Sequence, residues 1–172
     1  MSVRPATPED APAIAALHVQ SWRETYPGLL PEAYLARMTD DAMRGRREVE
    51  RARSIRDPAI LTLVAEHAGR VAGFVTGGAV RGDSAYGAEL YALYLLRAAQ
   101  GAGLGRALVR ELARGLQARG HRDLMLWVLA ENPTRGLYAH LGGTVLGEKT
   151  ERVPEGELRE VAYGWPDLSA LL

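Results

Sequence analysis

The sequence contains no cysteine. This absence excludes disulfide bonds, thiolate metal sites and any enzyme mechanism that passes through an acyl-cysteine intermediate. The histidines show no ligand spacing, such as two histidines four residues apart on one helix, so we expect no metal ion. The four histidines are His18, His67, His121 and His140.

Net charge and long apolar runs are also absent. The 21 basic and 21 acidic residues give a formal charge of zero, so no overall field attracts nucleic acid or an acidic membrane surface. Neither a signal peptide nor an apolar run of about 18 residues is present, which predicts a soluble cytoplasmic protein. A length of 172 residues suits a single domain that spans residues 1–172.

Basic residues gather in one stretch of the chain. Residues 40–53 have the pattern of a helix, and we expect its arginines to form a solvated face while Val49 and Ala52 turn inward. A nucleic-acid interface is the alternative for this stretch, and the zero net charge argues against it. The arginines in or next to the helix are Arg44, Arg46, Arg47, Arg51, Arg53 and Arg56.

Strand and helix patterns follow one another along the chain. The predicted order is strand, two or three helices, three strands, helix, strand, helix and two strands. This order indicates an α/β fold (an α+β mixed sheet) of about seven strands with helices on both faces. The predicted strands are 3–5, 59–67, 71–80, 89–96, 124–130, 144–153 and 158–165, and helices are predicted near 10–21, from about 31, and over 40–53, 104–116 and 134–141.

A glycine-rich segment, residues 100–106 (QGAGLGR), lies between a strand pattern and a helix pattern. The strand, 89–96, is rich in aromatic and aliphatic residues, and leucines four residues apart mark one apolar face of the helix. In such a turn, backbone N–H groups point inward and the helix N-terminus adds roughly half a positive charge. The segment therefore predicts a site for a phosphate group, with a turn that binds no ligand as the alternative.

Two well-known phosphate loops do not fit this segment. A dinucleotide-binding loop needs a glycine at its sixth position, but Arg106 stands there when counting from Gly101, and Leu108 when counting from Gly103. A Walker loop needs Gly-Lys followed by Ser or Thr, but the one lysine is Lys149, far downstream. A third kind of loop must therefore be considered.

The remaining pattern, Gln100-x-x-Gly103-x-Gly105, resembles the pyrophosphate loop of the GNAT superfamily of acyl-CoA-dependent N-acyltransferases. Residues 126–143 (LWVLAENPTRGLYAHLGG) are similar to the superfamily's second motif, in which a strand leads to an asparagine and then to a helix with an aromatic-Tyr pair. Residues 21–31 resemble the link between the first two helices of many bacterial members. The departures are Arg97 for Pro, Leu137 for Phe and Gly143 for Phe.

The resemblance implies a GNAT acyl-CoA N-acyltransferase fold that uses acetyl-CoA as co-substrate and no metal. Backbone N–H groups of the glycine segment would hold the phosphates, and the strand edge at residues 93–95 would pair with the pantetheine amides. Asn132 would reach the pantetheine arm, cap the next helix, or do both. The expected cofactor-binding residues are Leu93, Leu95, Gln100, Gly101, Ala102, Gly103, Leu104, Gly105, Arg106 and Asn132.

The resemblance also suggests which residues move protons. Tyr138 matches the family's general acid, and a phenol with a pKa of about 10 can protonate a departing thiolate whose conjugate acid has a pKa of about 8.5. Glu89 resembles the family's base, and strand alternation places it on the same side as Tyr91 and Leu93. The alternatives are a core packing role for Tyr138, an exposed edge charge at Glu89, and Glu24, Glu131 or water as the base.

The acceptor side of the reaction is defined less closely. Trp22, Tyr26 and Tyr91 are expected to line the acceptor pocket, although a Trp and a Tyr four residues apart on a helix also suit a core. The predicted reaction is direct transfer of an acetyl group to a primary amine of a small molecule or peptide in a ternary complex, and a catalytically silent acyl-CoA sensor is the alternative. The sequence leaves open the acceptor, other acyl groups and the oligomeric state, although family members often form homodimers.

Overall fold

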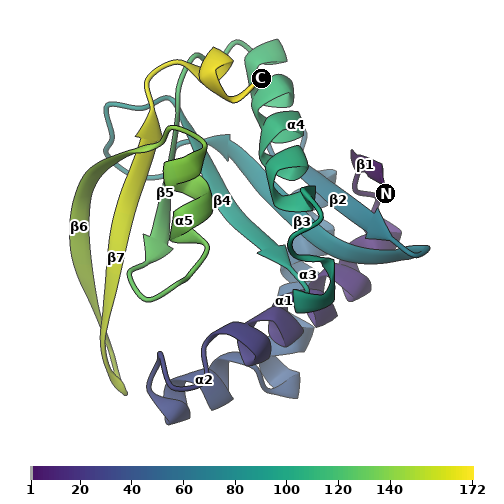
Figure 1. Cartoon of the computed structure of the whole chain (residues 1–172). Helices are drawn as coiled ribbons and strands as arrows, with labels where there is room; N and C mark the ends of the chain where they lie inside the picture. The colour runs from purple at the N-terminus through teal and green to yellow at the C-terminus, as the bar shows by residue number, and fades with distance from the viewer. Residues whose placement is uncertain (1) are drawn as a thin grey trace.

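The computed structural model describes residues 2–172, which build a single seven-stranded sheet in the order β1-β2-β3-β4-β5-β7-β6 (Figure 1). Neighbouring strands are antiparallel except β4 and β5, which are parallel. The predicted mixed α/β fold with helices on both faces is confirmed. The strands are β1 (Ser2–Pro5), β2 (Leu61–His67), β3 (Arg70–Ala79), β4 (Ala88–Leu95), β5 (Leu124–Leu129), β6 (Thr144–Val153) and β7 (Gly156–Trp165).

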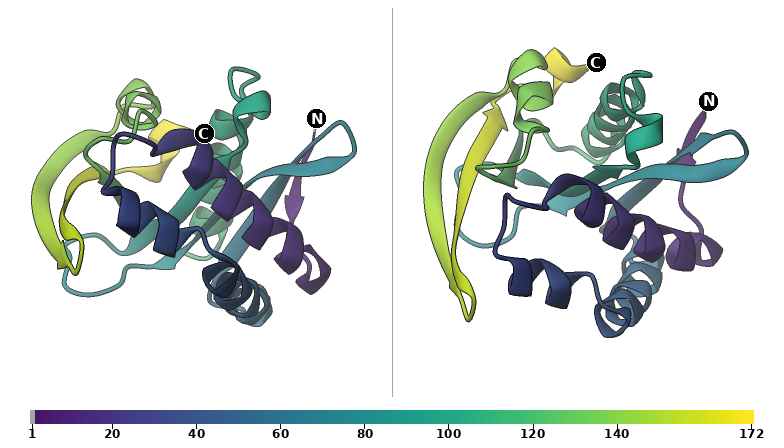
Figure 2. Two further views of the ribbon diagram at one scale, coloured as in Figure 1. Left: turned by 90° about the horizontal axis from the view of Figure 1, so that it is seen from below. Right: turned by 60° about the horizontal axis from the view of Figure 1, so that its bottom comes forward.

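The helices divide between the two faces of the sheet. The first three, α1, α2 and α3, lie together on one face, and α4 and α5 lie on the other (Figures 1 and 2). The predicted helix at 134–141 is slightly shorter than expected: it begins at Arg135, and the turn before it is held by bonds from the N–H groups of Arg135 and Gly136 to the carbonyls three residues earlier. The helices are α1 (Ala11–Thr25), α2 (Glu32–Met38), α3 (Asp41–Arg56), α4 (Leu104–Ala118) and α5 (Arg135–His140).

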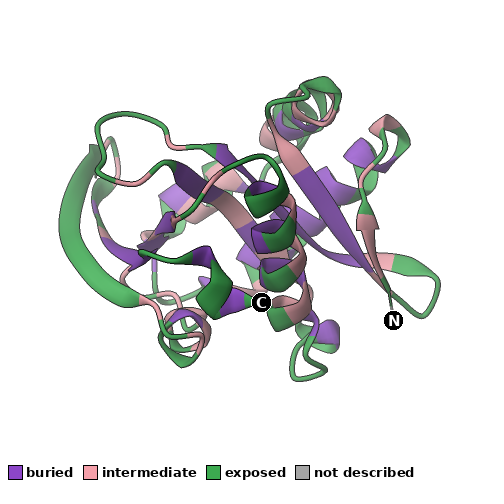
Figure 3. Cartoon of the chain, turned by 90° about the horizontal axis from the view of Figure 1, so that it is seen from above, coloured by how far each residue is buried: buried purple, intermediate pink, exposed green. Residues whose placement is uncertain are grey.

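Each central strand is buried on both faces, and alternate residues serve two different cores. Leu63 and Val75 pack under α4, where Leu108, Leu112 and Leu116 form the apolar stripe that the sequence predicts. Residues of β2 and β3 with the opposite parity pack against α1 instead. The strand that ends the sheet, β6, is exposed along almost its whole length (Figure 3).

The expected orientation of α3 is wrong. Val49 is 53% exposed, whereas Arg47 and Arg51 are buried on the side of α3 that faces the sheet. The charge pattern suggested a solvated arginine face, but α3 packs against aromatic rings of α1 and β3, and long arginine side chains cover such rings well. Among residues 2–172, no helix is long and apolar enough to cross a membrane.

Candidate functional site

The sheet opens between its two parallel strands. β4 and β5 pair at only two positions, Glu89 with Met125 and Leu90 with Leu126, and then separate. From residue 92 to residue 95, β4 therefore keeps a partner on its β3 side only. A strand edge of this kind leaves backbone N–H and C=O groups available to a ligand that binds in extended form.

A β-bulge in β4 accompanies this opening. Thr76 of β3 lies opposite Ala92, and the next residue, Gly77, lies opposite Leu90, so Tyr91 is an extra residue in β4. The bulge reverses the alternation of the strand: Leu90 and Leu93 both pack under α4. The expectation that Glu89, Tyr91 and Leu93 share one side is therefore wrong, because it assumed a regular strand.

A cavity of about 620 Å³ lies where the strands separate. Its walls come from the end of α1, the free part of β4, the glycine segment and the turn that precedes α5. Most of the predicted cofactor-binding residues meet here, namely Leu93, Leu95, Gln100, Gly101, Gly103, Gly105, Arg106 and Asn132. Ala102 and Leu104 line a smaller adjoining hollow of about 340 Å³ that shares Gly103 with the cavity.

The glycine segment has the backbone conformation that its composition indicates. Gly101 and Gly103 both have a φ of 79°, in the left-handed region that favours glycine, and Gly103 is the N-cap of α4. Gly105 lies close to α5: an added Cβ would lie 3.2 Å from Cδ2 of Leu137, which would have to shift slightly. The N-terminus of a fifteen-residue helix thus opens toward the cavity, where its dipole favours a bound anion.

Asn132 joins two walls of the cavity. Its Nδ2 donates a hydrogen bond of 2.8 Å to the hydroxyl of Tyr26, and its Oδ1 accepts one of 2.8 Å from the backbone N–H of Thr134. Asn132 therefore closes the turn that precedes α5, but the N-cap of the helix is Thr134, so the expected helix-capping role is wrong by two residues. Asn132 itself lines the cavity. Burial raises the pKa of Tyr26, and the nearby phenols of Tyr94 and Tyr138 add to this effect.

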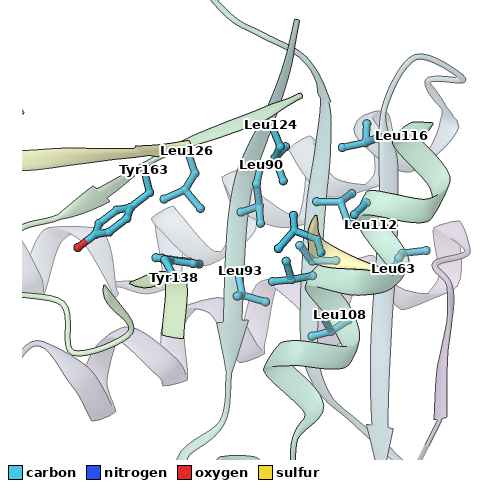
Figure 4. Close-up of a cluster of buried hydrophobic side chains, with 14 of the residues drawn as sticks. Leu63, Leu90, Leu93, Leu108, Leu112, Leu116, Leu124, Leu126, Tyr138 and Tyr163 are labelled. Atoms are coloured by element: carbon cyan, nitrogen blue, oxygen red, sulfur yellow. The ribbon is translucent and has the colours of Figure 1, made fainter. Parts of the chain in front are cut away.

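Tyr138 lies behind the cavity wall rather than on it. Leu137 lines the cavity, and the ring of Tyr138 packs in the core beside Tyr163 and Leu93 (Figure 4). Burial raises the pKa of the Tyr138 phenol, and the neighbouring Tyr94 raises it further. The phenol therefore stays protonated at neutral pH, as a general acid must be before it donates.

Glu89 is buried and is not the exposed edge charge that the sequence left open. Its two carboxylate oxygens accept hydrogen bonds from the backbone N–H, Nε and Nη2 of Arg81, with the shortest, from Nη2, at 2.7 Å. The Arg81 guanidinium also lies 4.2 Å from the centre of the Tyr91 ring. Glu89 and Tyr91 thus form a cluster outside the lining of the main cavity, on the side of β4 that faces α3.

The predicted acceptor residues separate into different environments. Tyr26 lines the cavity, whereas Trp22 is packed among aromatic side chains of α1 and α2 and does not. Two further cavity residues have structural partners: Oε2 of Glu24 accepts a 2.7 Å hydrogen bond from the backbone N–H of Arg97, whose guanidinium donates to the Glu24 carbonyl. The Glu24 carboxylate is thereby engaged in joining α1 to the β4–α4 connection, which no local sequence pattern reveals.

The residue types in the cavity suit a phosphorylated ligand and give no metal site. Across residues 2–172, no group of three or more His, Asp or Glu side chains is arranged to hold a metal ion. The cavity instead is lined by Arg106, glycine N–H groups and a helix N-terminus, and also by apolar and phenolic side chains. This combination suits a ligand with an anionic head and a less polar arm.

Two comparisons with known sequences give a match. A family model described as FR47-like protein matches residues 78–153, which contain β4, the glycine segment and α5. The uncharacterized N-acetyltransferase YuaI of Bacillus subtilis (strain 168) is 35% identical over 172 residues, which cover 99% of this chain and 96% of that protein.

Solved structures share the fold over more than 90% of each chain. PaiA N-acetyltransferase from Thermoplasma acidophilum, in complex with coenzyme A, matches with a TM-score of 0.68 and 22% identity over 93% of this chain and 96% of that chain. YncA from Salmonella typhimurium, with its cofactor acetyl-CoA, matches with a TM-score of 0.71 and 22% identity over 98% of this chain and 94% of that chain.

Proposed function

The chain belongs to the GNAT superfamily of N-acetyltransferases, and from this premise we propose that it transfers the acetyl group of acetyl-CoA directly to a primary amine of a small molecule or peptide. The observation that carries the proposal is the cavity at the opening between β4 and β5, which extends from the glycine segment to Tyr26 and Asn132. Coenzyme A in PaiA and acetyl-CoA in YncA, two proteins of the same fold, support the choice of co-substrate.

Acetyl-CoA suits the two ends of this cavity. The pyrophosphate would accept hydrogen bonds from the N–H groups of residues 101–106, and the Arg106 guanidinium would add a positive charge. The pantetheine amides would pair with the free edge of β4 at residues 93–95, and Asn132 would orient the arm from the opposite wall. The thioester would then lie near Tyr26 and Tyr94, which line the cavity, and in front of Tyr138.

The reaction forms a C–N bond and breaks a C–S bond, so one proton must leave the amine and one must reach the thiolate. Tyr138 would supply the second proton, and burial keeps its phenol neutral until then. Because its ring lies behind Leu137 in the cavity wall, the phenol would have to reach the thiolate past that side chain. Glu89 would take the first. Because Glu89 is buried outside the cavity lining and is paired with Arg81, the proton would have to reach it along a chain of water molecules from an amine on the α3 side of β4.

A screen of primary amines with acetyl-CoA, followed by release of the coenzyme A thiol, tests the proposal. We expect thiol release that depends on an amine, and intersecting lines in a two-substrate kinetic analysis, because the chain has no cysteine to form an acyl-enzyme. Parallel lines or protein acetylated without acceptor would overturn direct transfer. Tight binding of acetyl-CoA with no turnover of any amine would instead support the silent sensor.

A further inference from the structure

Two buried arginines lie on the face of the sheet from which the acceptor would approach. Arg47 and Arg51 stand one turn apart on α3 and are only 5% and 7% exposed. Their guanidinium groups lie 5.3 Å from the ring centre of Trp22 and 5.4 Å from that of Phe74, respectively. Both positive charges are therefore held on the inner side of the helix, where solvent screening is weak.

Neither arginine is neutralised by a buried carboxylate. Nη1 of Arg47 and Nε of Arg51 are buried and have no hydrogen-bond partner among residues 2–172. The nearest acidic oxygen is Oε1 of Glu50, 3.9 Å from Nη2 of Arg51, on a side chain that is 66% exposed. Burial lowers the pKa of both arginines, which reflects the cost of holding unpaired charge away from water. Proteins seldom keep buried charges unpaired unless a partner is supplied from outside.

Tyr94 connects this cluster with the proposed cofactor cavity. It lines the cavity, and its ring stacks on His18 with 4.3 Å between ring centres. Burial raises the pKa of Tyr94, while the charges of Arg47 and Arg51 act in the opposite direction, so both guanidinium groups are electrostatic neighbours of its phenol. Nδ1 of His18 is likewise buried without a partner. The unpaired nitrogens of Arg47, Arg51 and His18 thus gather near Tyr94, which borders the cavity.

We propose that Arg47 and Arg51 form a binding site for a carboxylate of the acceptor, so that the substrate class is an amino acid or another amine that carries an acidic group. Guanidinium groups suit this task because each presents N–H donors in a plane that matches the two oxygens of a carboxylate. The inference rests on the proposed function and deepens it. Neither arginine lines the cavity, so the side chains around them would have to move to admit the carboxylate, which would then lie on the α3 side of Tyr94 while the amine of the same molecule points toward the cavity that Tyr94 borders.

Matched acceptors that differ in one group provide the test. Amino acids, their carboxamides and the corresponding decarboxylated amines are compared by kcat/KM with acetyl-CoA. We expect the wild-type protein to prefer the acids by roughly 10- to 100-fold, the range that a charge-assisted hydrogen bond supplies. Arg47→Met and Arg51→Met, which keep an unbranched apolar stem, should abolish this preference. The exposed Arg46→Met and Arg53→Met on the same helix are the matched controls and should retain it.

Thermal stability separates a binding site from a packing role. If the arginines serve the acceptor, Arg47→Met and Arg51→Met should melt at the wild-type temperature or above, because an unpaired buried charge is removed. Lower melting temperatures with an unchanged acid preference would overturn the proposal and leave only packing on Trp22 and Phe74. A raised KM for acetyl-CoA with no change in acceptor preference would assign the site to coenzyme A phosphates and also overturn it. Turnover of amides and acids at equal rates would refute the carboxylate site alone, whereas failure to acetylate any amine would refute the proposed function.

Discussion

The side-chain amide of Asn132 donates a 2.8 Å hydrogen bond to the hydroxyl of Tyr26, although the two residues lie 106 positions apart in the chain. Tyr26 is the first residue after α1, and Asn132 follows β5, so this contact fixes the distance between two walls of the cavity. Because the phenol accepts this bond, its own proton stays available to a ligand. The tyrosine is only 2% exposed, since its ring packs among Trp22, Leu30 and Tyr34, yet it still borders the cavity.

A double-mutant cycle measures this contact. Tyr26→Phe removes the acceptor, Asn132→Ala removes the donor and the hydrogen bond from Thr134, and the double variant removes both. We expect a coupling free energy of roughly 0.5–1.5 kcal/mol in chemical unfolding. The KM for acetyl-CoA should rise in each single variant because the cavity walls lose their tie. Strictly additive single effects would show that the two side chains do not stabilise each other.

A second prediction concerns the glycine segment. Gly103→Asp places a negative charge where the pyrophosphate should bind, and aspartate tolerates the left-handed conformation that this position requires. We expect acetyl-CoA to raise the melting temperature of the wild-type protein and to lose this effect in the variant. Gly82→Asp is the matched control, because Gly82 has a φ of 74°, open space around it and no place in the cavity lining. Equal stabilisation of both variants by acetyl-CoA would remove the segment from the site.

The sequence predicted the glycine segment well because its signal is local. Gly101 and Gly103 stand where a strand pattern meets a helix pattern, and both need the left-handed backbone that glycine provides. The bulge at Tyr91 was missed, since a bulge depends on the partner strand. Its one trace in the sequence is the pair Gly77-Gly78 in β3, where added Cβ atoms would lie 2.7 Å from the Glu89 carbonyl oxygen and 2.9 Å from the Tyr91 hydroxyl.

The buried arginines could not be predicted for a different reason. Periodicity along α3 shows which residues share a face, but the charge of Arg47 and Arg51 indicated that this face should be solvated. What buries them is contact with Trp22 and Phe74, which come from other parts of the chain. Aromatic rings that approach from distant positions leave no pattern in the local sequence.

The buried His18 predicts a pH dependence of stability. Burial lowers the pKa of His18 well below its usual value, and the charges of Arg47 and Arg51 lower it further. In the unfolded chain the imidazole binds a proton below about pH 6.5. The contribution of His18 to the free energy of unfolding should therefore be constant above that pH and should fall as the pH drops below it. Its other neighbours, Trp22, Phe74 and Tyr94, carry no charge at these pH values.

Urea unfolding between pH 5 and pH 8 checks this prediction. His18→Gln removes the titrating group and should flatten the acid side of the profile, where one proton accounts for up to about 1.4 kcal/mol per pH unit. The exposed His140→Gln is the control and should leave the slope as in the wild-type protein. A steep acid limb that persists in His18→Gln would assign the dependence to other groups.

The last prediction concerns the phenol of Tyr138. Tyr138→Phe keeps the ring that packs between Tyr163 and Trp165 and removes only a hydroxyl, so the melting temperature and the affinity for acetyl-CoA should change little. If the phenol protonates the leaving thiolate, kcat should fall on the order of 10²-fold.

Because burial raises the pKa of Tyr138, the phenol stays protonated as the pH rises, and wild-type kcat should show no loss from this group up to about pH 10. A small thiol leaving group of low pKa needs less protonation, so an acyl donor of that kind should rescue the variant in part. Turnover like that of the wild-type protein in Tyr138→Phe, with a good acceptor amine, would transfer the acid role to water or to Tyr26, which lines the cavity.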